Sequence, residues 1–149
     1  MRIRRPEAGL AGRQSEWIAA MEPWRSLGYR RLDLDRYLRR MARTGRALVA
    51  EEKTEVLGIA VFQPDFLLGL FVALLAVRPE AAGRGIGRAL MVRVEKLAFA
   101  KKRWLWVSSD RQNRAAARFY RKLGFARVAR LPDLIRDGHE EILWRKGRS

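Results

Sequence analysis

The sequence predicts an α/β domain in which helices pack on a mixed β-sheet. Two helical segments come first, and the hydrophobic period then shortens from about 3.6 residues to about 2. The predicted order is two helices, a hairpin, a strand, a helix, a strand, a helix and two final strands, with a glycine-rich connection before the longest helix. This order is typical of an α/β sandwich, and 149 residues suffice for one domain with a substantial core.

Two helices are expected in the N-terminal third from the spacing of their apolar residues. Residues 17–21 carry an apolar face that Pro23 ends, because proline cannot continue a helix. Asp33 can cap the second helix, and Gly45 ends it. The apolar stripe of this second helix, spaced i, i+3, i+4 and i+7, is Leu34, Tyr37, Leu38 and Met41.

Six strands are expected from runs of alternating or continuous apolar residues. A polar turn at 51–55 joins the first two into a hairpin, and a turn at Asp137 and Gly138 joins the last two. The third run is almost continuously apolar, as expected for a strand buried on both faces. The expected strands are 47–50, 56–62, 70–77, 104–107, 126–131 and 141–144, and the later helices are 86–101 and 113–123.

Composition narrows the chemistry that the chain can perform. It contains no cysteine and one histidine, which excludes disulfides and thiol catalysis and argues against a dedicated transition-metal site. The basic N-terminus is not followed by the apolar segment of a signal peptide, and the longest apolar run, 66–77, is too short to span a membrane. We therefore expect a cytoplasmic protein with no membrane contact and no metal.

The net charge of +16 has three explanations. Only six of the 32 basic residues are lysine, and the arginines are spread along the chain, so a general compositional bias ranks first. An anionic ligand such as a nucleotide ranks second. Nucleic-acid binding ranks third, because charge is its only support, and any such binding should be weak and lost as salt rises.

The glycine-rich turn at 78–87, between a buried strand and a helix, is typical of phosphate binding. Glycine lets the backbone approach an anion, and the helix N-terminus offers free N–H groups. A P-loop would need Lys and then Ser or Thr after Gly87, where the chain has Arg88 and Ala89. A dinucleotide fingerprint would need a glycine at position 88 and an acidic residue near position 103, and both positions hold arginine. A P-loop is therefore excluded, and the match to a dinucleotide fingerprint is weak.

Two sequence signatures occur in order on the expected elements. The first, at 77–90, contains Gly-Arg-Gly-Ile-Gly-Arg-Ala-Leu, and the second, at 113–125, is Asn-Arg-Ala-Ala-Ala-Arg-Phe-Tyr-Arg-Lys-Leu-Gly-Phe. Together they resemble the cofactor loop and the second signature of the GNAT superfamily of N-acetyltransferases, over roughly residues 71–125. The resemblance implies a GNAT-like three-layer α/β sandwich with a central mixed, mostly antiparallel sheet, formed by residues 1–149 as a single acyl-CoA-dependent domain.

The resemblance also implies acetyl-CoA as co-substrate, held largely through the backbone. Asn113 matches the asparagine that contacts the cofactor arm, and it can also cap its helix. Ala82 departs from the family, where arginine or glutamine is usual, which lowers the expected affinity. The strand residues implied to contact the acetyl-pantetheine arm are Leu75, Ala76 and Val77, and those implied to hold the pyrophosphate are Gly83, Arg84, Gly85, Ile86, Gly87 and Arg88.

Tyr120 matches the tyrosine that serves the family as general acid for the leaving thiolate, although a tyrosine on an apolar stripe can equally be a core residue. The general base is not identified. Strand 70–77 has no carboxylate, which disfavours the branch of the family that acetylates histone lysines. Strand 104–107 lacks the glutamate of the branch that acetylates ribosomal-protein N-termini and has Trp106 near that place, so this branch is disfavoured too. His139 is expected to be solvated. The remaining carboxylates, each of which can also be an ordinary surface group, are Glu22, Asp137, Glu140 and Glu141.

The implied reaction is direct transfer of an acetyl group from acetyl-CoA to a primary amine, on a small molecule or a protein, in a ternary complex. No acyl-enzyme is expected, because the chain has no cysteine and no serine–histidine constellation. Two alternatives stay open: a basic nucleic-acid- or ribosome-associated domain, and a GNAT-like domain that binds acyl-CoA without turnover. A homodimer is possible, since dimers are common in the family.

Overall fold

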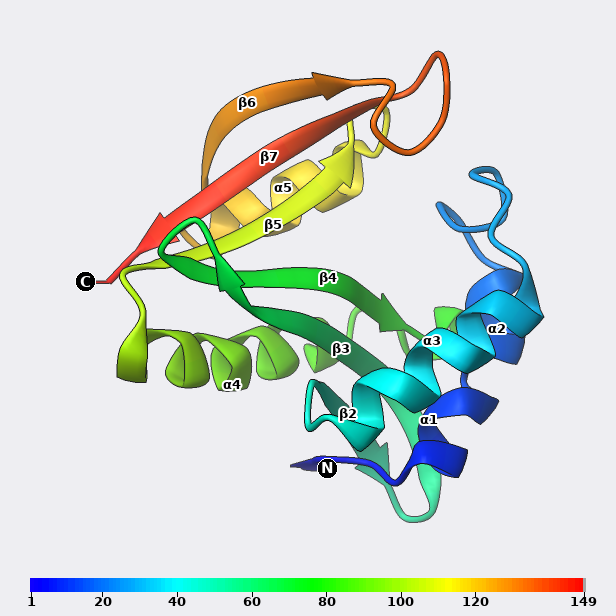
Figure 1. The fold of residues 1–149 in the computed structure, drawn as a ribbon. Coiled ribbons are helices and arrows are strands. Elements are labelled where there is room, and N and C mark those ends of the chain that lie inside the picture. The colour runs from blue at the N-terminus through cyan, green and yellow to red at the C-terminus, as the bar shows by residue number, and fades with distance from the viewer. Residues whose placement is uncertain (149) are drawn as a thin grey trace. The chain divides into compact units, whose positions relative to one another are not determined.

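The computed structural model describes residues 1–148 and contains a seven-stranded mixed sheet (Figure 1). Its strands are hydrogen-bonded in the order β1-β2-β3-β4-β5-β7-β6. Within these residues, no helix is both long enough and apolar enough to cross a membrane. The strands are β1 (Arg2–Arg4), β2 (Ala47–Glu52), β3 (Glu55–Phe66), β4 (Gly69–Val77), β5 (Trp104–Asp110), β6 (Ala126–Pro132) and β7 (Glu140–Gly147); the helices are α1 (Ala8–Arg13), α2 (Ser15–Ala19), α3 (Arg31–Arg43), α4 (Ile86–Lys101), α5 (Arg114–Lys122) and the short 3₁₀ helix Pro79–Ala81.

The chain forms two compact units, whose boundaries fall within β3, β4 and α4. The first unit comprises Met1–Phe62 and Leu74–Glu95. The second comprises Gln63–Ala73 and the chain from Lys96 onward. Each unit carries part of the residues that the sequence predicts to be functional.

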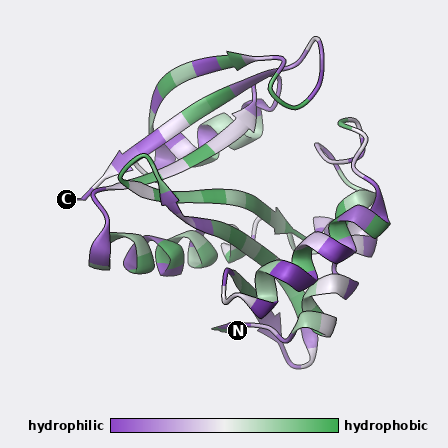
Figure 2. Ribbon diagram, in the orientation of Figure 1, coloured by the Kyte–Doolittle hydropathy of each residue, from purple (hydrophilic) through white to green (hydrophobic). Residues whose placement is uncertain are grey.

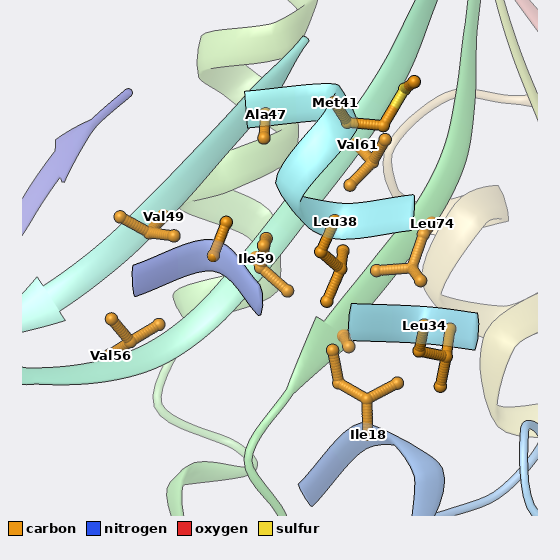
Figure 3. Close-up of a cluster of buried hydrophobic side chains, with 12 residues drawn as sticks. Ile18, Leu34, Leu38, Met41, Ala47, Val49, Val56, Ile59, Val61 and Leu74 are labelled. Carbon is orange, nitrogen blue, oxygen red and sulfur yellow. The ribbon is translucent and has the colours of Figure 1, made fainter. Parts of the chain in front are cut away.

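The core of the first unit lies between its sheet and the N-terminal helices. β1, β2 and β3 pair antiparallel. Ile59 of β3 and Leu38 of α3 are fully buried, and Figure 3 shows their side chains pointing toward one another. Leu74 of β4 and Ile18 of α2 lie in the same cluster. The apolar stripe predicted for the second helix therefore does face the core, as its spacing indicates.

The opposite face of β3 carries α4. Gly58, which alternates with Ile59 along the strand, is the contact point. A Cβ atom at position 58 would lie 2.9 Å from Cγ2 of Ile86 and 3.1 Å from Cδ1 of Leu90. The absence of a side chain at Gly58 thus allows the first two turns of α4 to pack directly on the strand.

The second unit contains a parallel pair followed by antiparallel strands. β4 and β5 pair in parallel, with Gly69–Val72 opposite Trp104–Val107, and β7 then pairs antiparallel with both β5 and β6. The register of β5 with β4 ends at Val107, so among the described residues Ser108–Asp110 pair only with β7. The end of β5 therefore has one free backbone edge. Figure 2 shows β4 as an almost continuously hydrophobic strand, as its sequence predicts.

The strands and helices expected from the sequence are present, with differences in detail. α1 was not expected, since the predicted apolar face began only at Trp17, and α2 already ends at Ala19, before Met21 and Pro23. β3 continues to Phe66 instead of ending at position 62. β1 was not expected, because a run of three residues carries no periodicity. Asp33 does not cap α3: the N-cap is Arg30, which makes no side-chain cap, and Asp33 lies in the first turn. β2 continues to Glu52, so the hairpin turn is tighter than 51–55 and has Lys53 at a φ of 59°. β5 and β7 are longer than expected, because each continues through polar residues at its ends.

Candidate functional site

In the first unit, the residues that the sequence predicts to be functional lie at the end of β4 and in the loop that follows it. Ala76 is buried, while Leu75 and Val77 are half-buried. Arg78 fixes the start of the loop, since its N–H donates to the Leu57 carbonyl at 2.8 Å and its Nε donates to the Val56 carbonyl at 2.7 Å. The loop therefore leaves β4 in a fixed direction.

Two glycines in the loop adopt a conformation that other residues rarely tolerate. Gly83 and Gly85 both have a φ of +80°, in the left-handed region. A Cβ at either position would meet no protein atom within 4 Å. Gly83 and Gly85 are thus favoured by the backbone and lie on an open side of the loop, whereas Gly87 is a half-buried residue in the first turn of α4.

The loop runs directly into α4. The helix begins at Ile86, and its first turn closes with the Ala89 N–H donating to the Gly85 carbonyl at 3.0 Å. The N–H groups of Ile86, Gly87 and Arg88 precede that bond and have no acceptor within the helix. Together with the positive end of the helix dipole, these groups have the chemistry that favours binding of an anion.

The arginine side chains of the loop differ in their surroundings. Arg84 is tied to the β2–β3 hairpin, with its Nη2 2.7 Å from the Glu52 carboxylate. Arg88 is exposed and has no acidic partner among residues 1–148. Arg84 therefore serves the loop mainly through its backbone, whereas the Arg88 guanidinium is available to a ligand.

Asn113 and Tyr120, which the sequence also predicts to be functional, lie at the start of α5 and within it, in the second unit. Asn113 is the N-cap of α5, and its Oδ1 accepts a hydrogen bond from the Ala116 N–H at 3.0 Å. The capping role predicted for Asn113 is therefore confirmed. The side-chain amide nitrogen has no protein acceptor within residues 1–148, so this group can still donate to a ligand.

Tyr120 is buried, with 6% of its surface exposed. Its ring lies among those of Phe119, Phe125 and Trp144, at centroid distances of 5.3, 5.6 and 6.4 Å. Burial raises the pKa of the phenol above its ordinary value, and the charge of Glu141 adds to the shift. The phenol thus keeps its proton throughout the neutral range, which suits a proton donor and excludes a base. The same packing makes Tyr120 a core residue, so the two interpretations are compatible.

Glu141 is the one of the four candidate carboxylates that is buried, with 5% of its surface exposed. Burial raises the pKa of its carboxyl group, and the neighbouring Asp110 adds to this shift, whereas the hydrogen bond from Ser108 and the nearby His139 oppose it. The Ser108 hydroxyl donates to Glu141 Oε1 at 3.1 Å. Asp110 is the register partner of Glu141, so their side chains lie on the same face of the sheet.

His139 is not an isolated solvated residue as expected from the sequence. Its Nδ1 lies 3.0 Å from Oδ2 of Asp110, and the ring is half-buried. Asp110, Ser108 and His139 therefore surround Glu141 with polar groups. No local signal identifies this cluster, because β5 and β7 come together only through long-range pairing.

The other three carboxylates have the surroundings of ordinary surface groups. Glu22 is exposed, and hydrogen bonds from the Ser26 hydroxyl, the Ser26 N–H and Arg25 lower the pKa of its carboxyl group. Glu140 lies 3.4 Å from Arg111 and 3.6 Å from Arg130. Asp137 is exposed in the turn before β7.

Comparison with known proteins identifies the family. The model of the acetyltransferase (GNAT) family matches residues 11–125, and the chain therefore belongs to this family. The GNAT-like α/β fold predicted from the sequence is confirmed by solved structures of similar fold.

Three of these structures have nearly the same extent as this chain. A GNAT-family acetyltransferase from Bacillus cereus superposes with a TM-score of 0.79 at 15% identity, covering 99% of this chain and 97% of that one. A ribosomal-protein-alanine N-acetyltransferase from Brucella melitensis gives 0.79 at 20% identity, covering 99% and 100%. An acetyltransferase from Salmonella typhimurium, solved with its cofactor acetyl-CoA, gives 0.80 at 22% identity, covering 99% and 93%. At these identities the likeness is one of fold.

Replacing Glu141 with glutamine should stabilise the protein increasingly as pH rises. A carboxyl group whose pKa is raised by folding contributes stability that is present below its unfolded pKa and is lost as pH rises through its folded pKa. Glutamine cannot ionise, so Glu141→Gln avoids that loss. Thermal unfolding measured from about pH 4 to about pH 8 should show a Tm difference that grows in favour of the variant. A difference that shrinks as pH rises would contradict the buried, ionisable state of Glu141.

Proposed function

We propose that this protein transfers an acetyl group from acetyl-CoA to a primary amine. The observation that carries the proposal is the loop, in which two left-handed glycines lead into the N-terminus of α4 in a chain of the GNAT family. The acetyl-CoA in the related Salmonella typhimurium structure supports the choice of cofactor. A thiol-release assay with acetyl-CoA and a panel of small and protein amines tests the proposal, and failure to release thiol with any amine, despite acetyl-CoA binding, would leave a non-catalytic binding protein.

The loop would hold the pyrophosphate through its backbone. The N–H groups of Gly83 to Arg88 offer donors, and the α4 dipole favours a negative charge at that end. Residues Leu75–Val77 would bind the acetyl-pantetheine arm through their own backbone groups, and the amide nitrogen of Asn113 would add a side-chain donor. Because backbone groups do most of the binding, Ala82 does not rule out the site.

The transfer would proceed directly between the two substrates. The amine nitrogen attacks the thioester carbonyl carbon, a new N–C bond forms, and the C–S bond breaks. A backbone amide at the end of β4 would polarise the carbonyl oxygen. Tyr120 would donate its proton to the departing sulfur, which is consistent with a phenol that stays protonated at neutral pH.

We assign the general base to Glu141. An amine that is protonated at neutral pH must lose a proton before it attacks, and a carboxylate with a raised pKa is a stronger base than an exposed one. Glu22 is less suitable because its hydrogen bonds lower the pKa of its carboxyl group, and Glu140 is less suitable because it is paired with two arginines. The half-exposed His139, 3.0 Å from Asp110 beside Glu141, would offer the proton a way to solvent.

Gly85→Val should weaken acetyl-CoA binding by more than about tenfold. A branched side chain would occupy the open side of the loop and strain a backbone with a φ of +80°. Gly28→Val is the matched control, since Gly28 has a φ of +81° and equally free surroundings but lies outside the loop. Calorimetry should show near-normal affinity for the control, and equal affinity in both variants would disprove the assignment of the loop.

Tyr120→Phe should lower kcat by about 10²–10⁴-fold while leaving acetyl-CoA affinity almost unchanged. The hydroxyl would act on charge that develops only in the transition state, and phenylalanine keeps the ring in its aromatic cluster. Tyr37→Phe, at a half-buried tyrosine of α3, controls for the loss of a phenol elsewhere. If Tyr120→Phe keeps full kcat but melts several degrees lower, Tyr120 is a core residue only.

Glu141→Gln should lower kcat/KM by at least about tenfold near neutral pH and remove the acidic limb that a carboxylate base imposes on the pH–rate profile. Glu140→Gln, the neighbouring carboxylate paired with two arginines, should stay within about twofold of the wild type. Since Glu141→Gln is expected to be the more stable protein at that pH, lost activity cannot be attributed to unfolding. An unchanged profile would disprove the assignment of the base.

A further inference from the structure

A groove of about 370 Å³ lies between α5 and the strands of the second unit. Five arginines surround it, far more than the single acidic residue among its lining groups. Three of them, Arg114, Arg118 and Arg121, come from one face of α5, because their spacing of four and three residues places them one above another. The remaining two are Arg111, before α5, and Arg127, on β6.

The floor of the groove is formed by Trp144. This residue is 1% exposed, and its indole N–H donates to the Ser109 hydroxyl at 2.9 Å. The guanidinium carbon of Arg121 lies 5.1 Å from the centre of the Trp144 ring, which holds this cation against the floor. The groove is thus built on a rigid, fully bonded side chain.

A β-bulge brings Arg127 to the same side of the sheet. Arg127 is the register partner of Trp144, and the register shifts between Arg127 and Ala129. Register partners in an antiparallel pair have their side chains on one face, so Arg127 lies on the Trp144 face. The groove is therefore lined by arginines from both α5 and β6.

The acidic residues near the groove already form hydrogen bonds or ion pairs with other groups. Oδ1 of Asp110 accepts from the Gln112 N–H at 2.8 Å, and Oδ2 lies 3.0 Å from His139. Glu140 is paired with Arg111 and with Arg130. Within residues 1–148, no carboxylate neutralises the exposed groove residues Arg114, Arg118 and Arg127.

Several unneutralised guanidinium groups around one groove repel one another, and this cost is offset when an anion binds. Linked phosphate groups fit this groove best, because they place several negative charges within a short distance and each can accept two parallel hydrogen bonds from a guanidinium. A nucleic-acid strand fits less well: Trp144 is too buried to stack on a base, whereas strand-binding grooves present exposed aromatic rings.

We propose that this groove binds a small ligand with two or three linked phosphate groups, through side chains that do not belong to the α4 loop. Arg114, Arg118 and Arg127 would bind the phosphates, and Arg121 would line the site from its position on Trp144. The groove is lined by residues of the second unit, and the three proposed phosphate contacts have no role in the proposed acetyl transfer.

Calorimetry with inorganic triphosphate, at physiological salt and with acetyl-CoA present in excess, tests the proposal. The wild type should bind one triphosphate per chain. Replacing Arg114, Arg118 and Arg127 together with glutamine should weaken this binding by at least about tenfold, because three charge-assisted contacts are lost. In the matched control, glutamine replaces three exposed arginines of α3, which lowers the net charge by the same amount; these are Arg31, Arg36 and Arg43. This control should change the affinity by less than about twofold.

Four results would overturn the proposal. The first is that the wild type does not bind triphosphate. The second is that the groove variant and the control weaken binding equally, which would indicate general attraction by net charge. Acetyl-CoA could displace the triphosphate, which would make the groove part of the cofactor site. A single-stranded RNA oligonucleotide could bind more tightly than triphosphate in a groove-dependent way, which would make the ligand a nucleic acid. Should the triple variant fail to fold, Arg118→Glu gives the comparison against Arg36→Glu, since both positions are exposed and each change lowers the net charge by two.

Discussion

The contact between Gly58 and the start of α4 is the constraint on which the loop depends. Because Gly58 has no side chain, Ile86 and Leu90 pack directly on β3, and this fixes both the height and the direction of the first turn of α4. At the other end of the loop, Arg78 is bonded to the carbonyls of Leu57 and Val56 on the same strand. The glycine-rich segment is thus held at both ends by β3, and its free N–H groups are oriented before any ligand arrives. Such preorganisation lowers the entropy that binding would otherwise cost.

The elements of the fold could be predicted because their signals are local. The stripe of α3, the apolar run of β4 and the cap at Asn113 each depend on residues within one or two turns of each other. The loop glycines could be predicted for the same reason, since a left-handed φ limits the residue type at that position alone. The family signature then connected these local features to a cofactor.

The surroundings of the candidate base could not be predicted in this way. Glu141 and Asp110 are neighbours only because β5 and β7 pair across the helix and strand between them, and the burial of Glu141 follows from that pairing. From the sequence, Glu22, Asp137, Glu140 and Glu141 were equivalent acidic residues. The clustering of positive charge could not be predicted either. Twenty-six arginines spread along the sequence indicate only a compositional bias. The bulge in β6 and one face of α5 bring some of these arginines together around the groove.

Asn113 uses its two side-chain atoms for different purposes, and this has a consequence for its replacement. The oxygen caps α5, while the nitrogen is left without a protein partner among the described residues. Aspartate caps a helix as well as asparagine does but offers an acceptor in place of the donor. A selection for folding alone would therefore accept either residue at position 113, whereas a selection for a ligand that needs the N–H would accept only asparagine. The residue found at position 113 can thus indicate whether selection acted on folding alone or also on ligand binding.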